Sequence, residues 1–309
     1  MMKRILLAAV VILLTGLAAC APAVSAPAPA AAAVVSSTPM VQATTLTPFQ
    51  PATHTPTRTP TETPMPTSTP TRTPRPMVTA TPEWHFHQPG EVVAPILLYH
   101  HVVEGEPENL YSVSIDTLRT HMQTLKEKGY TAISVTTLVK AIREGADLPE
   151  RPVVITFDDG YEEVFTNAYP VLRQYGFTAT AYLVSDYVGQ VFFLTPDEIH
   201  TLAGAGWEFG SHSISHAGLA GKGVNVAVQE VSMSQVRLKR QLGLPIETFA
   251  YPYGLWDGTV MDVVKAKYIA GMGLGTSNNH SLASIEYLSR FVVRSDTTLD
   301  EFVAQLPWH

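Results

Sequence analysis

The stretch VVITFDDGYEEVF, residues 153–165, runs through apolar residues and then places two aspartates side by side before a glycine. The apolar run VVITF is typical of a buried strand. Adjacent carboxylates repel each other, so a chain that leaves its core on Asp158 and Asp159 needs a positive charge to offset them. Strand alternation alone would send the two side chains to opposite faces. Because the chain turns at Gly160, we expect both to reach the same mouth.

Short apolar runs alternate with amphipathic stretches along the rest of the chain. One stretch predicts a helix between Ser114, as N-cap, and Gly129, as stop signal. Further helices are predicted over residues 136–144, 162–175, 196–205, 224–242 and 259–267. Strands are predicted over residues 92–100, 132–135, 153–157, 178–184, 207–212, 247–253, 269–275 and 288–293. This alternation predicts parallel βα units and favours a (β/α) barrel, complete or incomplete, over an open doubly wound sheet.

Polar and aromatic residues fall at the ends of four of these strands. Asp158 and Asp159 follow VVITF, His212 and His216 follow WEFG, His100 follows PILLY, and residues 251–253 follow ETFA. In barrels of parallel strands the chemistry takes place at the carboxyl ends of the strands. The sequence therefore predicts one site built from these residues.

The histidines 212 and 216 have the spacing H-x3-H. On a helical turn this spacing puts both imidazoles on one face, which suits a transition metal. Alone the pattern is weak, because a capping histidine and a surface histidine produce the same spacing. With a carboxylate from another strand end it completes a two-histidine, one-carboxylate site. Such a site leaves open positions, as catalytic metal sites do.

Three motifs occur in an order that is typical of one enzyme family. TFDDG at residues 156–160, SHSISH at 211–216 and FAYPYG at 249–254 resemble the motifs of the NodB-type polysaccharide deacetylases, carbohydrate esterase family 4. The resemblance covers most of residues 92–305. It implies a distorted (β/α)7 barrel as the fold. It also implies an enzyme that uses one divalent metal ion to remove acetyl groups from N-acetylated sugars. The stretch ILLYHHVV resembles a branch with a permuted barrel, which includes deacetylases of poly-β-1,6-N-acetylglucosamine.

The resemblance assigns roles residue by residue. Asp159, His212 and His216 would hold the metal, which would acidify its bound water and polarise the acetyl carbonyl. Asp158 would stay off the metal and act as the general base. The backbone N–H of Tyr253 would donate to the tetrahedral oxyanion. Zinc suits these ligands, as do cobalt and nickel. Without the metal, we expect the pKa of one of the two aspartates to be raised.

Two histidines compete for the role of the acid that protonates the leaving amine. In the permuted branch the acid lies in a Tyr-His motif on the first strand, which corresponds to His100; a histidine that merely caps the strand is the alternative. His280, in TSNNHSL, matches the late acid motif of other members poorly, and its Asn/Ser setting is typical of an exposed loop. By strand alternation His101 should point the other way from His100.

The third motif departs from the usual pattern of the family. Many members have an arginine just before the x-Pro-Tyr step, where it tethers the base aspartate, but this chain has Ala250. Arg290, at a late strand, is a candidate replacement; an exposed surface arginine is the alternative. Tyr161 and Trp256 are candidate substrate contacts in the cleft, with core packing and rim packing as the respective alternatives. Asp257 is predicted to cap the helix that follows it.

The first 90 residues carry no catalytic motif. Residues 1–20, MMKRILLAAVVILLTGLAAC, combine basic residues, a short apolar stretch and small residues, as secretory signals do. The ending LAAC resembles the bacterial lipobox, which predicts lipidation of Cys20 and a membrane anchor at the cell surface; an ordinary signal peptide is the alternative. Residues 21–90, rich in Pro, Thr and Ala, are predicted to be a disordered stalk. The catalytic domain is predicted over residues 91–309.

These observations together predict a hydrolase of linear amides, a metal-dependent deacetylase of polysaccharides that contain N-acetylglucosamine. The net charge of −7 argues against nucleic acid as a partner, and we expect a monomer. An inactive glycan-binding module on the same fold is the main alternative, although it would be expected to have lost a ligand or the base. A metal hydrolase of phosphoesters or small amides is another. The sequence leaves open whether the polymer is a β-1,6-linked exopolysaccharide, peptidoglycan, chitin fragments or xylan.

Overall fold

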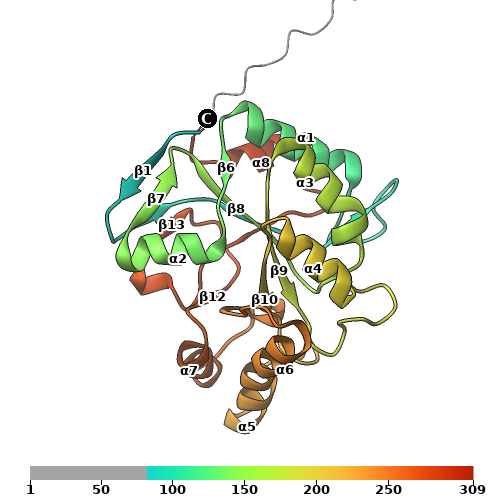
Figure 1. Ribbon diagram of the computed structural model, residues 1–309, viewed down its shortest axis with the longest axis vertical. Coiled ribbons are helices and arrows are strands. Elements are labelled where there is room, and N and C mark those ends of the chain that lie inside the picture. The colour runs from blue at the N-terminus through green and yellow to red at the C-terminus, as the bar shows by residue number, and fades with distance from the viewer. Residues whose placement is uncertain (1–81, 309) are drawn as a thin grey trace, which may run out of the picture. The chain divides into compact units, whose positions relative to one another are not determined.

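The computed structural model describes residues 82–308 (Figure 1). The predicted signal segment, the lipidation site at Cys20 and nearly all of the predicted stalk lie outside these residues. Within 82–308, no helix combines the length and the apolar character that crossing a membrane requires.

Parallel strands form the centre of the fold. Seven of them are neighbours in the order β12 (Ala270–Met272), β11 (Thr248–Ala250), β10 (Glu208–Ser211), β9 (Thr180–Leu183), β8 (Pro152–Phe157), β3 (Ile96–Tyr99) and β14 (Phe291–Val292). A further short strand, β6 (Thr131–Ala132), pairs with the first residues of β8. Every pairing in this sheet is parallel, as the alternation of strands and helices predicted.

Backbone hydrogen bonds join the two ends of this sheet. The segment that leads into β14 runs beside the end of β12: the Gly273 N–H donates to the Leu288 carbonyl at 2.8 Å, and the Gly275 N–H donates to the Arg290 carbonyl at 3.0 Å. The sheet therefore curls into a distorted (β/α) barrel, and the open doubly wound sheet did not form. Figure 1 shows the strands converging in the middle of the domain with helices outside them.

Alternation along β8 decides which side chains face the inside of the barrel. Val153, Ile155 and Phe157 belong to the large apolar cluster that includes buried apolar residues of every α-helix except α2 (Val135–Glu144). Val154 belongs to a second cluster, together with interior residues of β11 and β12. Because side chains alternate along a strand, Thr156 and then Asp158 follow Val154 on the inner side. The first aspartate of the pair is thus directed inward by the register of its own strand.

Eight α-helices lie in the described part of the chain. They are α1 (Ile115–Glu127), α2 (Val135–Glu144), α3 (Tyr169–Tyr175), α4 (Pro196–Gly204), α5 (Val224–Ala227), α6 (Met233–Leu242), α7 (Gly258–Lys267) and α8 (Leu299–Ala304). Ser114 and Asp257 cap α1 and α7 as predicted, since their side chains accept from Thr117 N–H and Val260 N–H. Wider, π-type turns over Val164–Ala168 and Val228–Ser232 interrupt the two long predicted helices.

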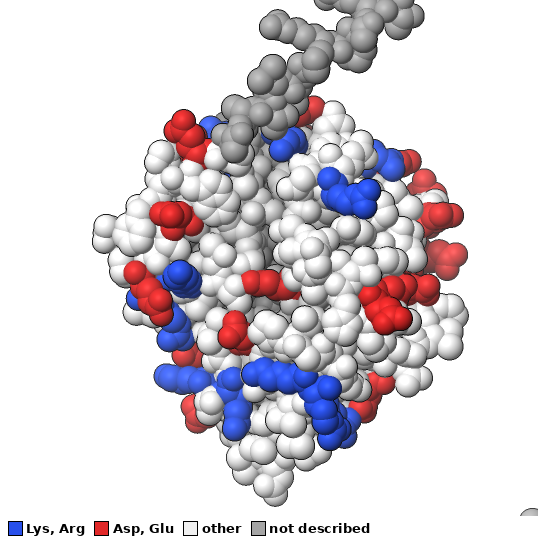
Figure 2. Space-filling model, in the orientation of Figure 1, with Lys and Arg blue, Asp and Glu red and all other residues white. Residues whose placement is uncertain are grey.

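Basic residues gather at one end of the domain. The last turns of α6 and α7 carry Lys239, Arg240, Lys265 and Lys267, where positive charge is favourable to the helix dipole. Figure 2 shows lysine and arginine side chains grouped over these helices, while acidic side chains are scattered over the rest of the visible face.

Three small pairings were not predicted. β1 (Trp84–His87) pairs antiparallel with β7 (Ala146–Pro149), β2 (Val92–Val93) with β13 (Asn279–His280), and β4 (His101–Val103) pairs parallel with β5 (Ser112–Ser114). The folded domain therefore begins before residue 91, and the predicted stalk boundary at residue 90 lies several residues too late. The strand predicted over 92–100 is divided, because Pro95 separates β2 from β3.

Candidate active site

A cleft of about 320 Å³ opens at the carboxyl ends of the barrel strands. Its lining includes the candidate residues that follow β3, β8, β10 and β11, namely His100, Asp158, Asp159, His212, His216 and Tyr253. Four strand ends that are far apart in sequence therefore supply one site. This is the location at which barrels of parallel strands place their chemistry.

Asp159, His212 and His216 form a set of potential metal ligands. The Oδ1 atom of Asp159 lies 3.2 Å from Nε2 of His216 and 3.5 Å from Nε2 of His212. Among the described residues this is the one group whose ligand atoms lie within 4.8 Å of one another. Asp159 Oδ1 is buried and has no hydrogen-bond partner within the described chain. An orphaned carboxylate oxygen between two imidazole nitrogens fits a divalent cation, and three protein ligands would leave it open positions.

A hydrogen bond behind His212 sets the orientation of its ring. Nδ1 of His212 lies 2.8 Å from the Ala250 carbonyl oxygen, which accepts a hydrogen bond from the Nδ1–H group and leaves Nε2 free to face Asp159. Burial lowers the pKa of His212 to about 4 and also lowers the pKa of His216. Both imidazoles are therefore neutral near pH 7, the state that binds a cation.

The histidine pair is held by a loop and not by the helical turn that its spacing suggested. Ser213 and His216 have φ values of 70° and 60°, in the left-handed region that is costly for residues other than glycine. The Glu230 carboxylate stabilises the loop, because it accepts from the N–H groups of Ile214 and Ser215 at 2.9 and 3.0 Å. Sequence reasoning missed Glu230, since it lies on the helical segment after the motif.

Asp158 is fixed by Arg290. The two guanidinium nitrogens donate to its two carboxylate oxygens at 2.7 and 2.8 Å, and both side chains are buried. Arg290 Nε also donates to the Gly273 carbonyl at 3.0 Å, and the guanidinium lies over the Tyr182 ring. The expected contact between Arg290 and the first aspartate is present, and the exposed surface arginine considered as its alternative is wrong.

The two adjacent aspartates differ strongly in acidity. Burial by itself raises the pKa of Asp158, but the positive charge of Arg290, with a smaller contribution from His212, outweighs it and lowers that pKa to about 2. Burial and the neighbouring Asp158 raise the pKa of Asp159 to about 7. The expectation that one pKa of the pair is raised without metal is confirmed. Asp158 has a counterion in Arg290, whereas Asp159 has no charged partner among residues 82–308 and is the residue that a bound cation would neutralise.

The structure separates the two candidate acids. His100 lines the cleft, and its Nδ1 atom is buried without a hydrogen-bond partner in the described chain. Burial lowers its pKa to about 4, although the charge of Asp158 acts in the opposite direction. His280 is fully buried in β13, where its Nε2 lies 3.0 Å from the Ala94 carbonyl oxygen, and it is absent from the cleft lining. The expectation that His280 lies in an exposed loop is wrong, because pairing with β2 covers it.

His101 also lines the cleft, contrary to the expectation from alternation. Strand β3 ends at Tyr99, so the alternation does not continue through both histidines. Nδ1 of His101 lies 2.8 Å from Oε2 of Glu163, and its ring stacks on Tyr161 with 3.8 Å between centroids. Tyr161 therefore faces the cleft, as predicted for a substrate contact, and is not packed in the core.

The turn after β11 places Tyr253 at the mouth of the cleft. Tyr253 and Gly254 have φ values of 59° and 67°, and the Tyr253 ring lies 4.5 Å from the His216 ring while 60% of the residue is exposed. A Cβ atom at Gly254 would lie 2.6 Å from Leu274, so only glycine fits there. Trp256 is half exposed beside Tyr287 and does not line the cleft, so its predicted role as a substrate contact has no support from the cleft geometry.

Comparisons with known proteins agree with this description. Residues 145–270 match the family model described as "Polysaccharide deacetylase". The chain is 28% identical over 190 residues to the Bacillus subtilis protein named "Putative polysaccharide deacetylase YxkH", with 62% of this chain and 66% of that protein covered. It is 25% identical over 204 residues to the poly-beta-1,6-N-acetyl-D-glucosamine N-deacetylase of Staphylococcus aureus, with 60% and 69% covered. The solved structure of the Streptococcus pyogenes deacetylase PplD in complex with acetate matches with a TM-score of 0.62 at 25% identity, over 70% of this chain and 98% of that chain.

Together with these matches, the barrel and the aspartates and histidines at the carboxyl ends of its strands place the chain among hydrolases that act on amide bonds. Within that class, this chain carries a polysaccharide deacetylase domain of the NodB type, carbohydrate esterase family 4. The matched regions span about two thirds of the length of the two curated relatives.

Proposed function

We propose that this protein removes N-acetyl groups from a polysaccharide that contains N-acetylglucosamine. The observation that carries the proposal is that the two adjacent aspartates have different partners. Asp158 is held by Arg290 at 2.7 Å, and Asp159 faces two neutral histidines without a counterion. The named activity of the Staphylococcus aureus relative supports this choice of substrate class.

Asp159, His212 and His216 would hold one divalent cation, with zinc the best match to two imidazoles and one carboxylate and with cobalt or nickel also suitable. When bound, such a cation supplies Lewis-acid chemistry: it polarises the acetyl carbonyl and makes a water molecule more acidic. The buried setting of Asp159 strengthens the attraction between its carboxylate and the cation.

Asp158 is suited to accept the proton of the attacking water. Arg290 keeps the carboxylate ionised and fixes both of its oxygens, so the base does not have to be reoriented during turnover. The ion pair also explains why the base needs no arginine at position 250. The backbone N–H of Tyr253, at the mouth of the cleft, would donate to the oxyanion that forms on the acetyl group.

His100 would donate the proton that the leaving amine requires. Its ring lies in the cleft. Burial lowers the pKa of the imidazole to about 4, so His100 would take up the proton during the reaction, and the negative charge of Asp158 favours that protonated form. Its buried Nδ1 has no partner in the described chain, so no protein hydrogen bond at that atom opposes a change of protonation. In one turnover Asp158 gains a proton and His100 loses one. Transfer of a proton from Asp158 to His100 then restores both residues for the next turnover.

The test is the release of acetate from a panel of acetylated glycans. Three are N-acetylated, namely β-1,6-linked N-acetylglucosamine oligomers, chitin oligomers and peptidoglycan fragments, and the fourth, acetylated xylan, carries O-acetyl esters. We expect release from at least one N-acetylglucosamine polymer, loss of release after chelation, and recovery when zinc, cobalt or nickel is added. Asp158→Asn should lower turnover by a factor of about 10² to 10⁴. Undiminished release after complete removal of metal would exclude this mechanism. No release from any glycan would favour a binding module on the same fold.

We also propose that the protein acts outside the cytoplasm, anchored to a membrane through a lipid on Cys20. The support is the sequence alone: the lipobox-like ending LAAC and the Pro/Thr-rich residues that follow it. Labelling of cells with a radioactive or clickable fatty acid, followed by fractionation, tests the proposal. The wild-type chain should carry label and sediment with membranes, and Cys20→Ala should abolish both. Secretion of an unlabelled wild-type chain would contradict it.

A further inference from the structure

A groove larger than the cleft lies beside it and is not explained by the reaction. This groove has a volume of about 510 Å³, against about 320 Å³ for the cleft. Tyr111, Leu274 and Val292 line both, so the groove and the cleft adjoin each other. Both volumes are within the range of about 300–1,000 Å³ in which proteins bind small molecules.

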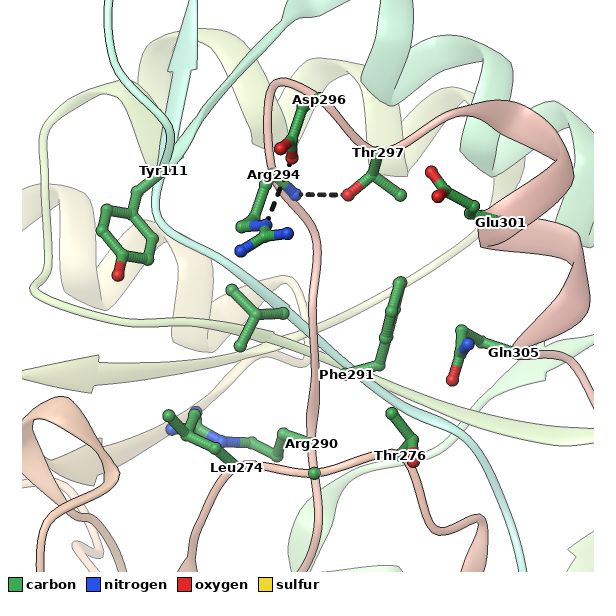
Figure 3. Close-up of a pocket in the computed structure, with 12 residues that line it drawn as sticks. Tyr111, Leu274, Thr276, Arg290, Phe291, Arg294, Asp296, Thr297, Glu301 and Gln305 are labelled. Atoms are coloured by element: carbon green, nitrogen blue, oxygen red, sulfur yellow. Dashed lines mark hydrogen bonds and ion pairs between the residues drawn. The ribbon is translucent and has the colours of Figure 1, made fainter.

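Arg290, which holds Asp158, and the residues that follow it form the floor of the groove. Arg290 lines the groove and holds Asp158 at 2.7 Å, and β14 begins at the next residue. Figure 3 shows Phe291 in the middle of the groove, with Arg294 on one side and Gln305 on the other. A molecule in the groove would therefore lie against a strand that is rigidly connected to the catalytic aspartate.

The lining combines apolar faces with planar polar groups. Phe291 and the half-exposed Tyr111 offer ring faces, and Thr276, Arg294 and Gln305 offer hydrogen-bonding groups at the edges. Sugar rings present the matching surfaces, an apolar face of C–H groups and a rim of hydroxyl and amide groups. Aromatic side chains bind such faces, and planar polar side chains can bind two neighbouring hydroxyl or amide groups at once.

The charges in the groove favour a ligand without net charge. Nε of Arg294 lies 3.2 Å from Oδ1 of Asp296, and its backbone N–H donates to Thr297 Oγ1 at 2.9 Å, as the dashed lines in Figure 3 mark. Oε2 of Glu301 accepts from the N–H and the hydroxyl of Thr298 at the start of α8. Both cations that line the groove are thus paired, Arg294 with Asp296 and Arg290 with Asp158. An anionic ligand would find no free positive charge, whereas an uncharged sugar needs none.

We propose that this groove binds the uncharged sugar units next to the one that is deacetylated. This inference rests on the proposed function, and it adds a location for the polymer on the domain. The groove makes the enzyme prefer a chain over a single sugar, because contacts at Phe291 and Thr276 form only when the substrate extends past Tyr111. The gain should lie in KM, since the contacts are remote from the reacting atoms and the same in ground and transition states.

Acetate release from N-acetylglucosamine oligomers of one to six units, in a β-1,6-linked and a β-1,4-linked series, tests the inference. For the wild-type protein we expect kcat/KM to rise about tenfold or more between the shortest and the longest oligomers that react. Thr276→Trp, which fills the groove from an exposed position, should flatten this length dependence. Phe291→Leu, which keeps an apolar side chain but removes the ring, should reduce it. Thr201→Trp, the same change at an exposed position of α4 outside the groove, should retain it.

The outcomes distinguish this inference from the proposed function. Two results would overturn the proposed role of the groove and leave the deacetylase proposal standing. One is acetate release by the wild-type protein that does not depend on oligomer length, and the other is a length dependence that Thr276→Trp leaves intact. No release from any oligomer would contradict the proposed function itself. Thermal unfolding of each variant identifies a protein that failed to fold, and Phe291→Leu then supplies the second, independent reading.

Discussion

Arg290 and Asp158 form a two-pronged ion pair, at 2.7 and 2.8 Å, between residues 132 positions apart in the sequence. The guanidinium also bonds Thr156 Oγ1 and the Gly273 carbonyl, so the arginine links β8, the end of β12 and the segment before β14. Asp158, the proposed base, is therefore tied to the residues that join the ends of the sheet. Catalytic geometry and the joining of the sheet ends depend on the same side chain.

Arg290→Lys should lower both the stability of the fold and the turnover of the enzyme. Lysine retains the charge but cannot donate to both oxygens of Asp158 and to Gly273 at the same time. We expect the free energy of unfolding to fall by about 1–3 kcal/mol and turnover to fall by up to about 10²-fold through misplacement of the base. Urea denaturation and acetate release measure the two effects.

The matched control for this change is Arg237→Lys. Arg237 pairs with Asp186 at the surface, where both side chains are partly exposed, so its loss should cost about 1 kcal/mol or less. An Arg290→Lys protein with the turnover and stability of the wild type would show that the tether has no role in orienting the base.

His100→Asn should lower activity, whereas His280→Asn should lower stability. His100 lies in the cleft, so its replacement should lower kcat by a factor of about 10² to 10⁴ with little change in KM. His280 packs against β2 and bonds the Ala94 carbonyl, so its replacement should lower the free energy of unfolding by about 1–3 kcal/mol and keep turnover. Kinetics combined with thermal unfolding makes the comparison. The reverse ranking in kcat would assign the acid to His280.

Asp159→Asn should stabilise the metal-free protein at high pH. The pKa of Asp159 in the folded protein, about 7, is above the value near 3.9 expected in the unfolded chain, so the folded state holds this proton more tightly. The metal-free wild type therefore loses stability relative to Asp159→Asn as the pH rises from about 4 to about 7. Above pH 7 the difference should reach about 2–4 kcal/mol.

The measurement is urea unfolding of both chelated proteins between pH 5 and 8. Taking the difference between the two proteins removes the opposing contribution of the buried histidines, whose lowered pKa values reduce stability as the pH falls below about 6.5. Added zinc should stabilise the wild type and leave Asp159→Asn almost unchanged. A difference that does not vary with pH would mean that Asp159 is ionised normally in the folded state.

Glu230→Gln should weaken metal binding without touching a ligand. The carboxylate accepts from two backbone N–H groups and the Ser215 hydroxyl, and it thereby stabilises a loop with left-handed residues on either side. Loss of such a supporting contact commonly reduces metal affinity by about 10- to 100-fold. Titration with zinc against a competing chelator measures the affinity. Glu247→Gln, an exposed glutamate far from the loop, is the control and should bind zinc as the wild type does.

Much of the fold followed from patterns that act over short distances. The alternation of apolar strands and amphipathic helices was sufficient for a parallel barrel, because each βα unit signals itself locally. Most predicted helices and strands lie within a few residues of the observed ones, and Ser114 and Asp257 cap their helices as their sequence positions indicate. The interruptions at Val164 and Val228 carry no such local signal, since a π-type turn preserves the helical pattern around it.

The remaining features depend on contacts between distant segments. His280 looked exposed because its neighbours are Asn and Ser, but pairing of β13 with β2 buries it. His101 faces the cleft because β3 ends one residue earlier than the apolar run suggested. Arg290 was identified as a tether only by the absence of an arginine at position 250. Its bond to Gly273 and its place in the groove could be seen only after the barrel had closed.

The pairing of β1 with β7 has a mechanical consequence. β7 precedes β8, so the chain enters the domain beside the amino end of β8, and the two aspartates stand after its carboxyl end. A strand of six residues is about 20 Å long, and it separates the entry point from the cleft. Tension on the chain ahead of residue 82 would therefore load the small β1–β7 sheet. The cleft, after the carboxyl end of β8, lies outside that small sheet.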